Sequence, residues 1–251
     1  MPEAAGGAAL RVCALYPDLM NIYADRGNLI VLERRCEWRG IGFELTASGL
    51  GEPLDPDGHD VYYIGGGQDR DQRLCAEDLL DTKASALRAA AARDAVILGV
   101  CGGYQLLGNA YTLGDERIEG VGLLDLETIR EDGPRLIGNV AIDPTGLPGT
   151  PHGALLAGFE NHGGRTYLGA GQAPLGRVLR GKGNDGRSGV EGAIAGATIG
   201  TYLHGPLLPK NVWFADWLIA RALAWAPGAL AALDDTVEDQ THAAAMRAAG
   251  V

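Results

Sequence analysis

The chain lacks several features that would assign it to a simple functional class. Lys and Arg together number 21 against 32 Asp and Glu, which gives a formal net charge of −11. This excess of acid argues against nucleic acid as a partner, because binding to a phosphate backbone needs clustered basic residues. The most apolar stretch, Ala95–Tyr104, is about half as long as the roughly 20 residues that span a bilayer, and the N-terminus carries no signal sequence. We therefore expect a cytoplasmic protein without a transmembrane segment.

Cysteine is scarce, and its spacing gives no metal site. The four cysteines form no CxxC pair, and no histidine follows one of them at a zinc-site interval. In a reducing compartment the expected state is four free thiols. The GxxxxGK[ST] pattern of an ATP-binding P-loop is also missing. The chain is therefore not expected to activate a carboxylate with ATP by itself.

Glycine is abundant, with 39 residues, which predicts many turns and close backbone approaches. A loose tail over residues 1–9 precedes a first half in which apolar strands alternate with helical patterns. The expected strands and helices of this half lie at 10–15, 28–38, 42–47, 61–64, 71–93, 95–100 and from Cys101 to about 107. This order predicts an α/β fold with a mostly parallel sheet and helices on both faces.

From residue 120 onward the pattern changes to short strands separated by Gly and Pro turns. We expect these strands at 126–130, 136–142, 155–159, 178–180, 192–195 and 198–203, followed by helices at 211–224 and 237–249. The chain is thus expected to form one domain over residues 10–226 and a C-terminal helical extension over 227–251.

The strand that ends at Val100 leads directly into the segment Gly99-Val-Cys-Gly-Gly103, and a helical pattern follows. This arrangement is typical of a nucleophile elbow, a tight turn that lifts a reactive side chain above the edge of a sheet and needs flanking glycines. The positive end of the following helix favours the thiolate form of Cys101. The backbone amide of Gly102 is placed to stabilise an oxyanion. Cys101 is therefore the predicted nucleophile.

A cysteine nucleophile needs an adjacent base, and two of the five histidines are candidates. His204 follows an apolar strand and is bounded by glycine and Pro206, where a side chain can reach across the sheet edge towards a neighbouring loop. His162, in Glu160-Asn-His-Gly-Gly-Arg165, is the competitor. The residues alone favour His204 but leave both open.

Taken together, the motifs resemble class I glutamine amidotransferases of the cobyric acid synthase-like branch. The segments Gly65-Gly-Gly-Gln-Asp69 and Gly99-Val-Cys-Gly-Gly-Tyr-Gln105, with the late His204, carry this resemblance. Four further segments resemble the glutaminase subunit of lipid II isoglutaminyl synthases, namely residues 16–28, 135–139, 160–166 and 200–206. The resemblance covers residues 10–225 and implies the flavodoxin-like fold of that family.

The resemblance implies how the reaction runs. Cys101 attacks the side-chain amide of glutamine, and the backbone N–H groups of Gly66 and Gly102 hold the oxyanion. His204 gives a proton to the leaving ammonia and then activates the water that releases glutamate. This assignment moves the choice of base towards His204.

The resemblance also implies a substrate site and a partner. Arg135 matches a family arginine that holds the substrate carboxylate, which a guanidinium can do with two parallel bonds, and Gln105 matches a position that contacts the bound glutamine. Ammonia would pass to a Mur-ligase-type subunit that uses ATP and Mg to amidate the D-glutamate of lipid II to D-isoglutamine, a step of peptidoglycan biosynthesis. The heterodimer would then work at the inner membrane face, and this chain itself would need no cofactor or metal.

Pro206 departs from the family pattern, because most class I amidotransferases have a glutamate there that orients the histidine. Loss of such an acid can cost about 10⁴ in rate through the wrong tautomer. Two explanations stay open: another carboxylate of this chain, for which Glu160 is a candidate, or an acid from the partner, which we favour. The competing functions are a glutaminase for another acceptor such as a corrinoid carboxylate, a stand-alone Cys/His hydrolase, and a binding module with a relic site.

Overall fold

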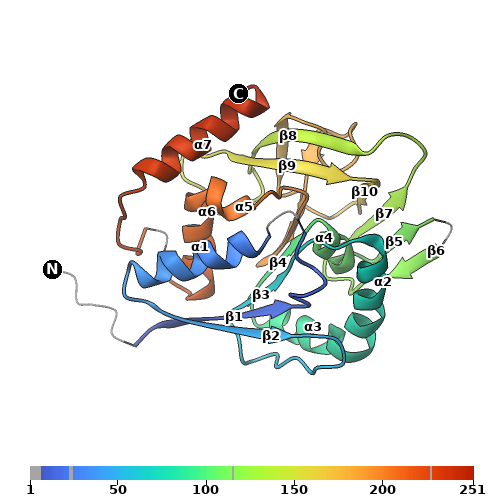
Figure 1. The fold of residues 1–251 in the computed structure, drawn as a ribbon, viewed down its shortest axis with the longest axis horizontal. Helices are drawn as coiled ribbons and strands as arrows, with labels where there is room; N and C mark the ends of the chain where they lie inside the picture. The colour runs from blue at the N-terminus through green and yellow to red at the C-terminus, as the bar shows by residue number, and fades with distance from the viewer. Residues whose placement is uncertain (1–6, 23–24, 115, 227) are drawn as a thin grey trace.

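A mostly parallel sheet forms the centre of the chain in a computed structural model, which describes residues 7–22, 25–114, 116–226 and 228–251 (Figure 1). Its strands lie in the order β13–β14–β4–β3–β1–β2. In that order they span Ala193–Ala195, Thr198–Thr201, Val96–Val100, Val61–Ile64, Ala9–Leu15 and Gly42–Ser48. Only β13 runs antiparallel to its neighbour among these described strands. The predicted mostly parallel sheet is confirmed.

Helices cover both faces of this sheet, as predicted (Figure 1). On one face α1 (Arg26–Glu37) packs against α6 (Val212–Ala222), and on the other lie α3 (Ala84–Ala92) and α4 (Gly102–Leu107). Strands β3 and β4 are buried along their whole length. Their continuous apolar sequences follow from this burial, because a parallel strand covered on both faces has no side that contacts water.

The single long helix expected before β4 is interrupted in the structure. A π-helical turn (Leu79–Lys83) separates α2 (Asp69–Asp78) from α3. In this turn Lys83 is fully buried, forms an ion pair with Asp78 and places its ammonium 4.8 Å from the centre of the Tyr16 ring. The Ala/Leu pattern predicts a helix here. It does not predict the π turn, because the turn is accompanied by the contact of Lys83 with Tyr16, which is distant in the sequence.

Two smaller sheets follow β4 in the chain and lie beyond the carboxyl edge of the central sheet (Figure 1). One has the order β10–β7–β5–β6, formed by Gly164–Leu168, Leu126–Arg130, Ala110–Leu113 and Glu116–Glu119. The other has the order β12–β11–β8–β9, formed by Val190–Glu191, Gly176–Arg180, Leu136–Asp143 and Leu156–His162. The sequence pattern does not predict β5, β6, β10 and β12. These strands are short, and β6 buries only Ile118, so they carry little hydrophobic pattern.

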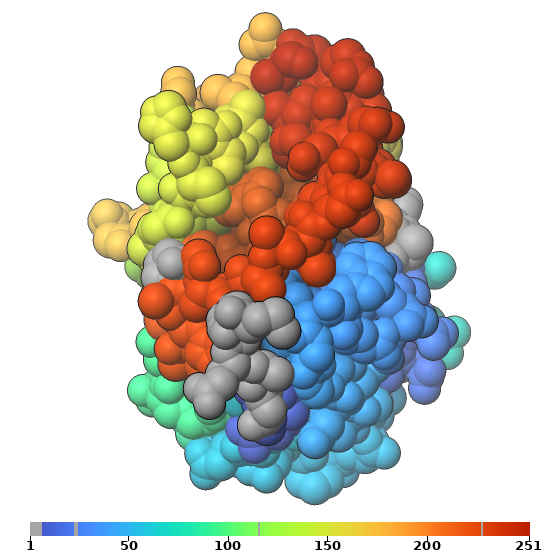
Figure 2. Space-filling model, turned by 90° about the vertical axis from the view of Figure 1, so that its left-hand side faces the viewer, coloured from blue at the N-terminus to red at the C-terminus, as the bar shows by residue number. Residues whose placement is uncertain are grey.

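The C-terminal helix α7 (Thr236–Ala249) lies across β8 and β9, after the short α5 (Leu207–Lys210) and α6 (Figure 1). Met246 of α7 is buried with Ala141 and Ala157 of the two strands. Figure 2 shows the chain after α6, coloured orange to red, running over the face that carries α1. Of the loose tail expected at 1–9, residues 1–6 lie outside the described residues and Ala9 begins β1. No described helix is long and apolar enough to cross a membrane.

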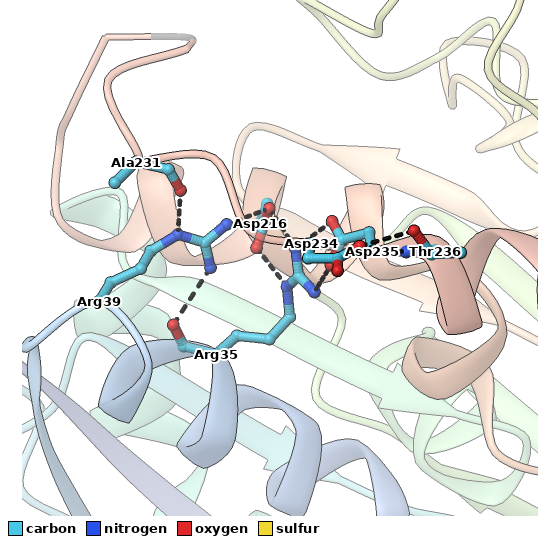
Figure 3. A network of polar contacts seen from close by, with 7 residues as sticks. All are labelled: Arg35, Arg39, Asp216, Ala231, Asp234, Asp235 and Thr236. Atoms are coloured by element: carbon cyan, nitrogen blue, oxygen red, sulfur yellow. Dashed lines mark hydrogen bonds and ion pairs between the residues drawn. The ribbon is translucent and has the colours of Figure 1, made fainter.

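A buried arginine ties this C-terminal segment to the domain (Figure 3). Arg35 of α1 is 1% exposed and donates to both carboxylate oxygens of Asp216 on α6, at 2.5 and 2.6 Å. It also donates to both oxygens of Asp235, just before α7, at 2.7 and 2.9 Å. Arg39 adds bonds of 2.7 Å to Asp216 and to the carbonyl of Ala231. Paired, planar bonds of this kind hold the segment before α7 over α1.

The substitution Arg35→Ala should lower the free energy of unfolding by about 3 kcal/mol, because it leaves Asp235 without its guanidinium partner and Asp216 with Arg39 alone. Denaturant titration followed by tryptophan fluorescence measures this loss. Arg34→Ala is the matched control on the same helix. Among the described residues, Arg34 forms an ion pair with Glu37 alone, at the surface and at 2.6 Å. Its loss should cost less than about 1 kcal/mol. Equal losses in the two variants would contradict the role given to the buried network.

Candidate active site

Cys101 has a strained backbone conformation at the carboxyl end of β4. Its φ and ψ angles are 53° and −104°, and a positive φ is uncommon for a residue other than glycine. Strain of this kind persists only where the surrounding structure imposes it, and it clusters at functional sites. The predicted nucleophile elbow after a central strand is confirmed.

Two glycines let the elbow pack tightly against the sheet. A Cβ at Gly103 would lie 2.2 Å from the carbonyl oxygen of Ile64, and a Cβ at Gly99 would lie 2.8 Å from the backbone of Gly103. Only glycine allows α4 to approach β3 and β4 this closely. The Gly103 N–H then donates to the carbonyl of Gly65 at 3.0 Å. This bond joins the elbow to the glycine loop, Gly65–Gly67.

Cys101 lines a cleft between the carboxyl edge of the central sheet and the two smaller sheets, and it is 8% exposed. The cleft walls come from distant parts of the chain. They include Gln72 of α2, Gln105 of α4, Arg130 of β7, Arg135 just before β8, and Asn161 and His162 of β9. The structure therefore brings together the predicted nucleophile and both residues expected to bind substrate, Gln105 and Arg135.

The side chain of Gln105 is held at both of its amide atoms. Its Oε1 accepts a hydrogen bond from Gln72 at 2.7 Å, and its Nε2 donates to the hydroxyl of Tyr202 at 3.0 Å. That hydroxyl also bonds to Thr166 at 2.6 Å. The carboxamide is thus fixed at the cleft and keeps one N–H and one lone pair for a ligand. The sequence gives no sign of Gln72, Thr166 or Tyr202 in this role.

The cleft carries charges of both signs. Arg135 donates to the side chain of Asn161 at 2.8 Å and to its carbonyl at 2.7 Å. Arg130 lines the same cleft, and Asp69, at the N-terminus of α2, lines it as well. Neither Arg130 nor Asp69 forms an ion pair with a described residue. A ligand with one negative and one positive group, such as an amino acid, would find partners for both here.

Burial raises the pKa of the Cys101 thiol to about 12, and the carboxylate of Asp25 acts in the same direction. A hydrogen bond from the Gly102 N–H to the sulfur and the charge of Arg135 lower the pKa, but they do not offset the burial. The expectation that the N-terminus of α4 keeps Cys101 ionised is therefore wrong, because desolvation outweighs the helix end. The resting group is a thiol, so a base must remove its proton during attack.

His204 follows β14, the strand beside β4. The Cys101 N–H donates to the carbonyl of Thr201 at 2.8 Å, and His204 stands three residues further along the chain. Its side chain is fully buried. Burial lowers the pKa of His204 to about 4, with the charge of Lys210 acting in the same direction. The imidazole is thus neutral at pH 7, which is the form that can accept a proton.

His162, the other candidate base, lines the cleft directly. Its Nδ1 lies 2.8 Å from the carbonyl oxygen of Gly164, and its ring stacks on Tyr202 with 3.6 Å between ring centres. Burial lowers its pKa to about 3, so it is also neutral at pH 7. The charge of Arg135 acts on the pKa of both histidines and of Cys101. In each of the three groups this charge lowers the pKa.

The two predicted oxyanion donors differ in what they bind. The Gly102 N–H points to the sulfur of Cys101. The Gly66 N–H donates to Oδ2 of Asp25 at 2.8 Å and is occupied in this conformation. Asp25 belongs to the segment 16–28, whose residues 23 and 24 lie outside the described residues. Its place in the sequence gives no sign that it reaches the glycine loop.

Glu160 is the candidate in this chain for the acid missing at Pro206. Its side chain is 1% exposed, and its two carboxylate oxygens accept the backbone N–H groups of Lys182 and Gly183 at 2.6 and 2.8 Å. These bonds hold a turn, and the pKa of His204 is shifted by burial, Lys210 and Arg135 rather than by Glu160. Among the described residues, no group of three or more His, Cys, Asp and Glu side chains could hold a metal ion.

Glu191 supports the segment that leads to His204, a role that the sequence does not predict. This fully buried carboxyl accepts the backbone N–H of Tyr202 at 2.6 Å and the hydroxyl of Thr201 at 3.0 Å. Burial raises the pKa of Glu191 to about 8. The signal in the sequence is weak, because a glutamate among glycines usually faces solvent.

The raised pKa of Cys101 predicts slow alkylation near neutral pH. The rate with iodoacetamide should rise about tenfold per pH unit from pH 7 to 9 without a plateau, since only the thiolate reacts. Peptide mass mapping after timed quenching measures the rate at this residue, with free cysteine as the reference. A plateau below pH 8 would show that the thiol ionises easily and would contradict the assigned environment.

Comparison with known proteins agrees with this geometry. Residues 11–212 match the CobB/CobQ-like glutamine amidotransferase domain. The chain is 36% identical over 215 residues to the lipid II isoglutaminyl synthase (glutamine-hydrolyzing) subunit GatD of Streptococcus pneumoniae, covering 85% of this chain and 80% of that protein. It is 39% identical over 206 residues to the GatD subunit of Staphylococcus aureus, covering 82% and 81%.

A solved structure shares the fold. The structure of PurLQS from Thermotoga maritima aligns with a TM-score of 0.57 and 20% identity, covering 86% of this chain and 95% of that chain. The family match spans most of the chain and includes the elbow at Cys101. The chain therefore belongs to the CobB/CobQ-like glutamine amidotransferase family and is a glutamine-hydrolysing enzyme.

Proposed function

We propose that the chain is the glutaminase subunit of a lipid II isoglutaminyl synthase. It hydrolyses L-glutamine to glutamate and ammonia, and a Mur-ligase-type partner uses ATP and Mg to join the ammonia to the D-glutamate of lipid II. The observation that carries the proposal is the strained Cys101 in a cleft with charges of both signs. The similarity to two GatD subunits over about four fifths of each chain supports the choice of acceptor.

In this scheme the cleft binds glutamine as a zwitterion. Arg135, with Arg130 beside it in the cleft lining, holds the α-carboxylate, and Asp69 faces the α-ammonium. The carboxamide of Gln105 keeps one donor and one acceptor for the substrate. The side-chain amide then reaches Cys101, which lines the same cleft. A substrate without both charges would lose one of these contacts.

The chemistry follows from the neutral state of the thiol and the imidazole. As the sulfur of Cys101 attacks the amide carbon, His204 takes the thiol proton, and backbone N–H groups hold the oxyanion. The imidazolium then gives its proton to the leaving ammonia, which leaves a thioester. His204 next removes a proton from water, and attack of this water on the thioester releases glutamate and restores the thiol.

The partner has a second role in this proposal, because position 206 carries a proline where most class I amidotransferases have the glutamate that orients the histidine. Since the carboxylate of Glu160 is bonded to the backbone, we favour an acid that the partner subunit supplies. Glutamine hydrolysis would then accelerate on assembly of the heterodimer. The complex would act on the cytoplasmic side of the membrane, where the partner meets lipid II, and this chain would bind no cofactor or metal.

The base is tested by replacing each histidine in turn. His204→Gln should lower kcat for glutamine hydrolysis by about 10³-fold, because general acid–base catalysis contributes roughly 10²–10⁴. His162→Gln should lower kcat less than about tenfold, as expected for a residue that shapes the cleft without transferring protons. Glutamate release is the readout, and the melting temperature shows whether each variant is folded. The opposite ranking would make His162 the base.

The acceptor is tested with the purified heterodimer. Co-expression with an ATP-dependent Mur-type ligase should give a complex that amidates lipid II with glutamine, measured by mass spectrometry. Cys101→Ala should abolish this amidation, and ammonium chloride should restore it because the ligase remains intact. Amidation of a corrinoid but not of lipid II would contradict the proposal.

The acid supplied by the partner is tested by comparing glutaminase rates. Equal rates for the free chain and the complex would contradict this part of the proposal.

A further inference from the structure

Asp25 is a buried carboxylate near Cys101 that the reaction scheme does not use. It stands directly before α1 and is 1% exposed. Its Oδ2 accepts the Gly66 N–H at 2.8 Å, whereas its buried Oδ1 has no hydrogen-bond partner among the described residues. A buried carboxylate oxygen without a partner is costly, so its presence calls for an explanation beyond local stability.

The backbone N–H and carbonyl of Gly66 both form hydrogen bonds within the protein. Its carbonyl accepts the Ile22 N–H at 3.1 Å, and its N–H donates to Asp25. A Cβ at Gly66 would lie 3.3 Å from the Cβ of Cys101, so this part of the glycine loop packs directly against the nucleophile. Gly66 cannot donate to an oxyanion without giving up its bond to Asp25.

Gly67, the next residue of the loop, differs from Gly66 in the hydrogen bonding of its N–H. It lines the cleft, and its N–H has no hydrogen-bond acceptor among the described residues. The Gly67 nitrogen lies 3.2 Å from the position that a Cβ on Gly102 would take. The N–H groups of these two glycines thus come from adjacent backbone segments beside the nucleophile, as the donors of an oxyanion hole do.

We propose that Asp25 is a positioning residue for glutamine hydrolysis, which holds the Gly66 peptide so that Gly67, rather than Gly66, supplies the second oxyanion donor. This inference rests on the proposed hydrolysis at Cys101. The same carboxylate opposes ionisation of the thiol. Removing Asp25 therefore changes two observables in opposite directions: the thiol becomes more reactive, and catalysis becomes slower. Removing a residue that only stabilises the fold would not raise the reactivity of the thiol while slowing catalysis.

Two variants of Asp25 isolate its hydrogen bond from its charge. Asn keeps an oxygen that can accept the Gly66 N–H, Ala removes it, and both remove the charge. In the full-length chain, Asp25→Ala should lower kcat for glutamine by about 100-fold, the effect of losing one oxyanion donor, with KM changed less than threefold. Asp25→Asn should stay within about tenfold of the native kcat, because it keeps the bond that holds the loop.

The two variants should behave alike in a second measurement. Burial raises the pKa of Asp25 to about 7, so in the native chain most of it is charged above that pH. Above pH 7 both variants lack this neighbouring charge, and both should shift the pH dependence of Cys101 alkylation to lower pH. A glutamine analogue with an aldehyde in place of the amide forms a tetrahedral adduct with the thiol, and it should bind more weakly to the Ala variant than to the Asn variant. Asp18→Ala, an exposed acid of the same segment, is the control and should change none of these values.

Three outcomes would overturn the proposal. They are a native kcat in Asp25→Ala, a kcat above the native value, and equal losses of kcat in the Ala and Asn variants. A rise in kcat would mean that Asp25 blocks the Gly66 N–H instead of orienting its neighbour. Failure of the underlying reaction is recognised separately, because Cys101→Ala would then hydrolyse glutamine as fast as the native chain.

Discussion

The site depends on the strained backbone of Cys101, which two neighbouring strands hold in place. Its N–H donates to the carbonyl of Thr201, the last residue of β14, and its carbonyl accepts the Gln105 N–H at 3.1 Å in the first turn of α4. The glycine loop after β3 fixes the other side through Gly103. Because three parts of the central sheet converge here, the surrounding structure maintains the unfavourable φ. The cleft then forms where the smaller sheets cover this point.

Burial sets the electrostatic state of this site. It raises the pKa of the thiol and lowers the pKa of both nearby histidines, so all three groups are neutral at pH 7. A neutral thiol and a neutral imidazole are a consistent pair, because the second can accept the proton of the first at the moment of attack. The permanent charges lie around them, on Arg130 and Arg135 and on Asp69, where a charged substrate would meet them.

The parts of the fold that the sequence predicts are those fixed by local pattern. Continuous apolar runs indicate the parallel strands, and the glycines around Cys101 indicate the elbow, since both follow from steric requirements of a few adjacent residues. The π turn at Lys83, the small strands of the cleft and the protonation of Cys101 depend on contacts between distant segments. Asp25 is the clearest case, because its partner Gly66 lies 41 residues away in the chain.

The protonated resting state of Cys101 has a consequence for the lifetime of the enzyme. Peroxides oxidise cysteine through its thiolate, and susceptibility also rises with exposure to solvent. The thiol of Cys101 has a pKa of about 12, so little thiolate is present at pH 7, and the residue is only 8% exposed. The chain therefore keeps its nucleophile in a form that resists conversion to sulfenic acid between turnovers.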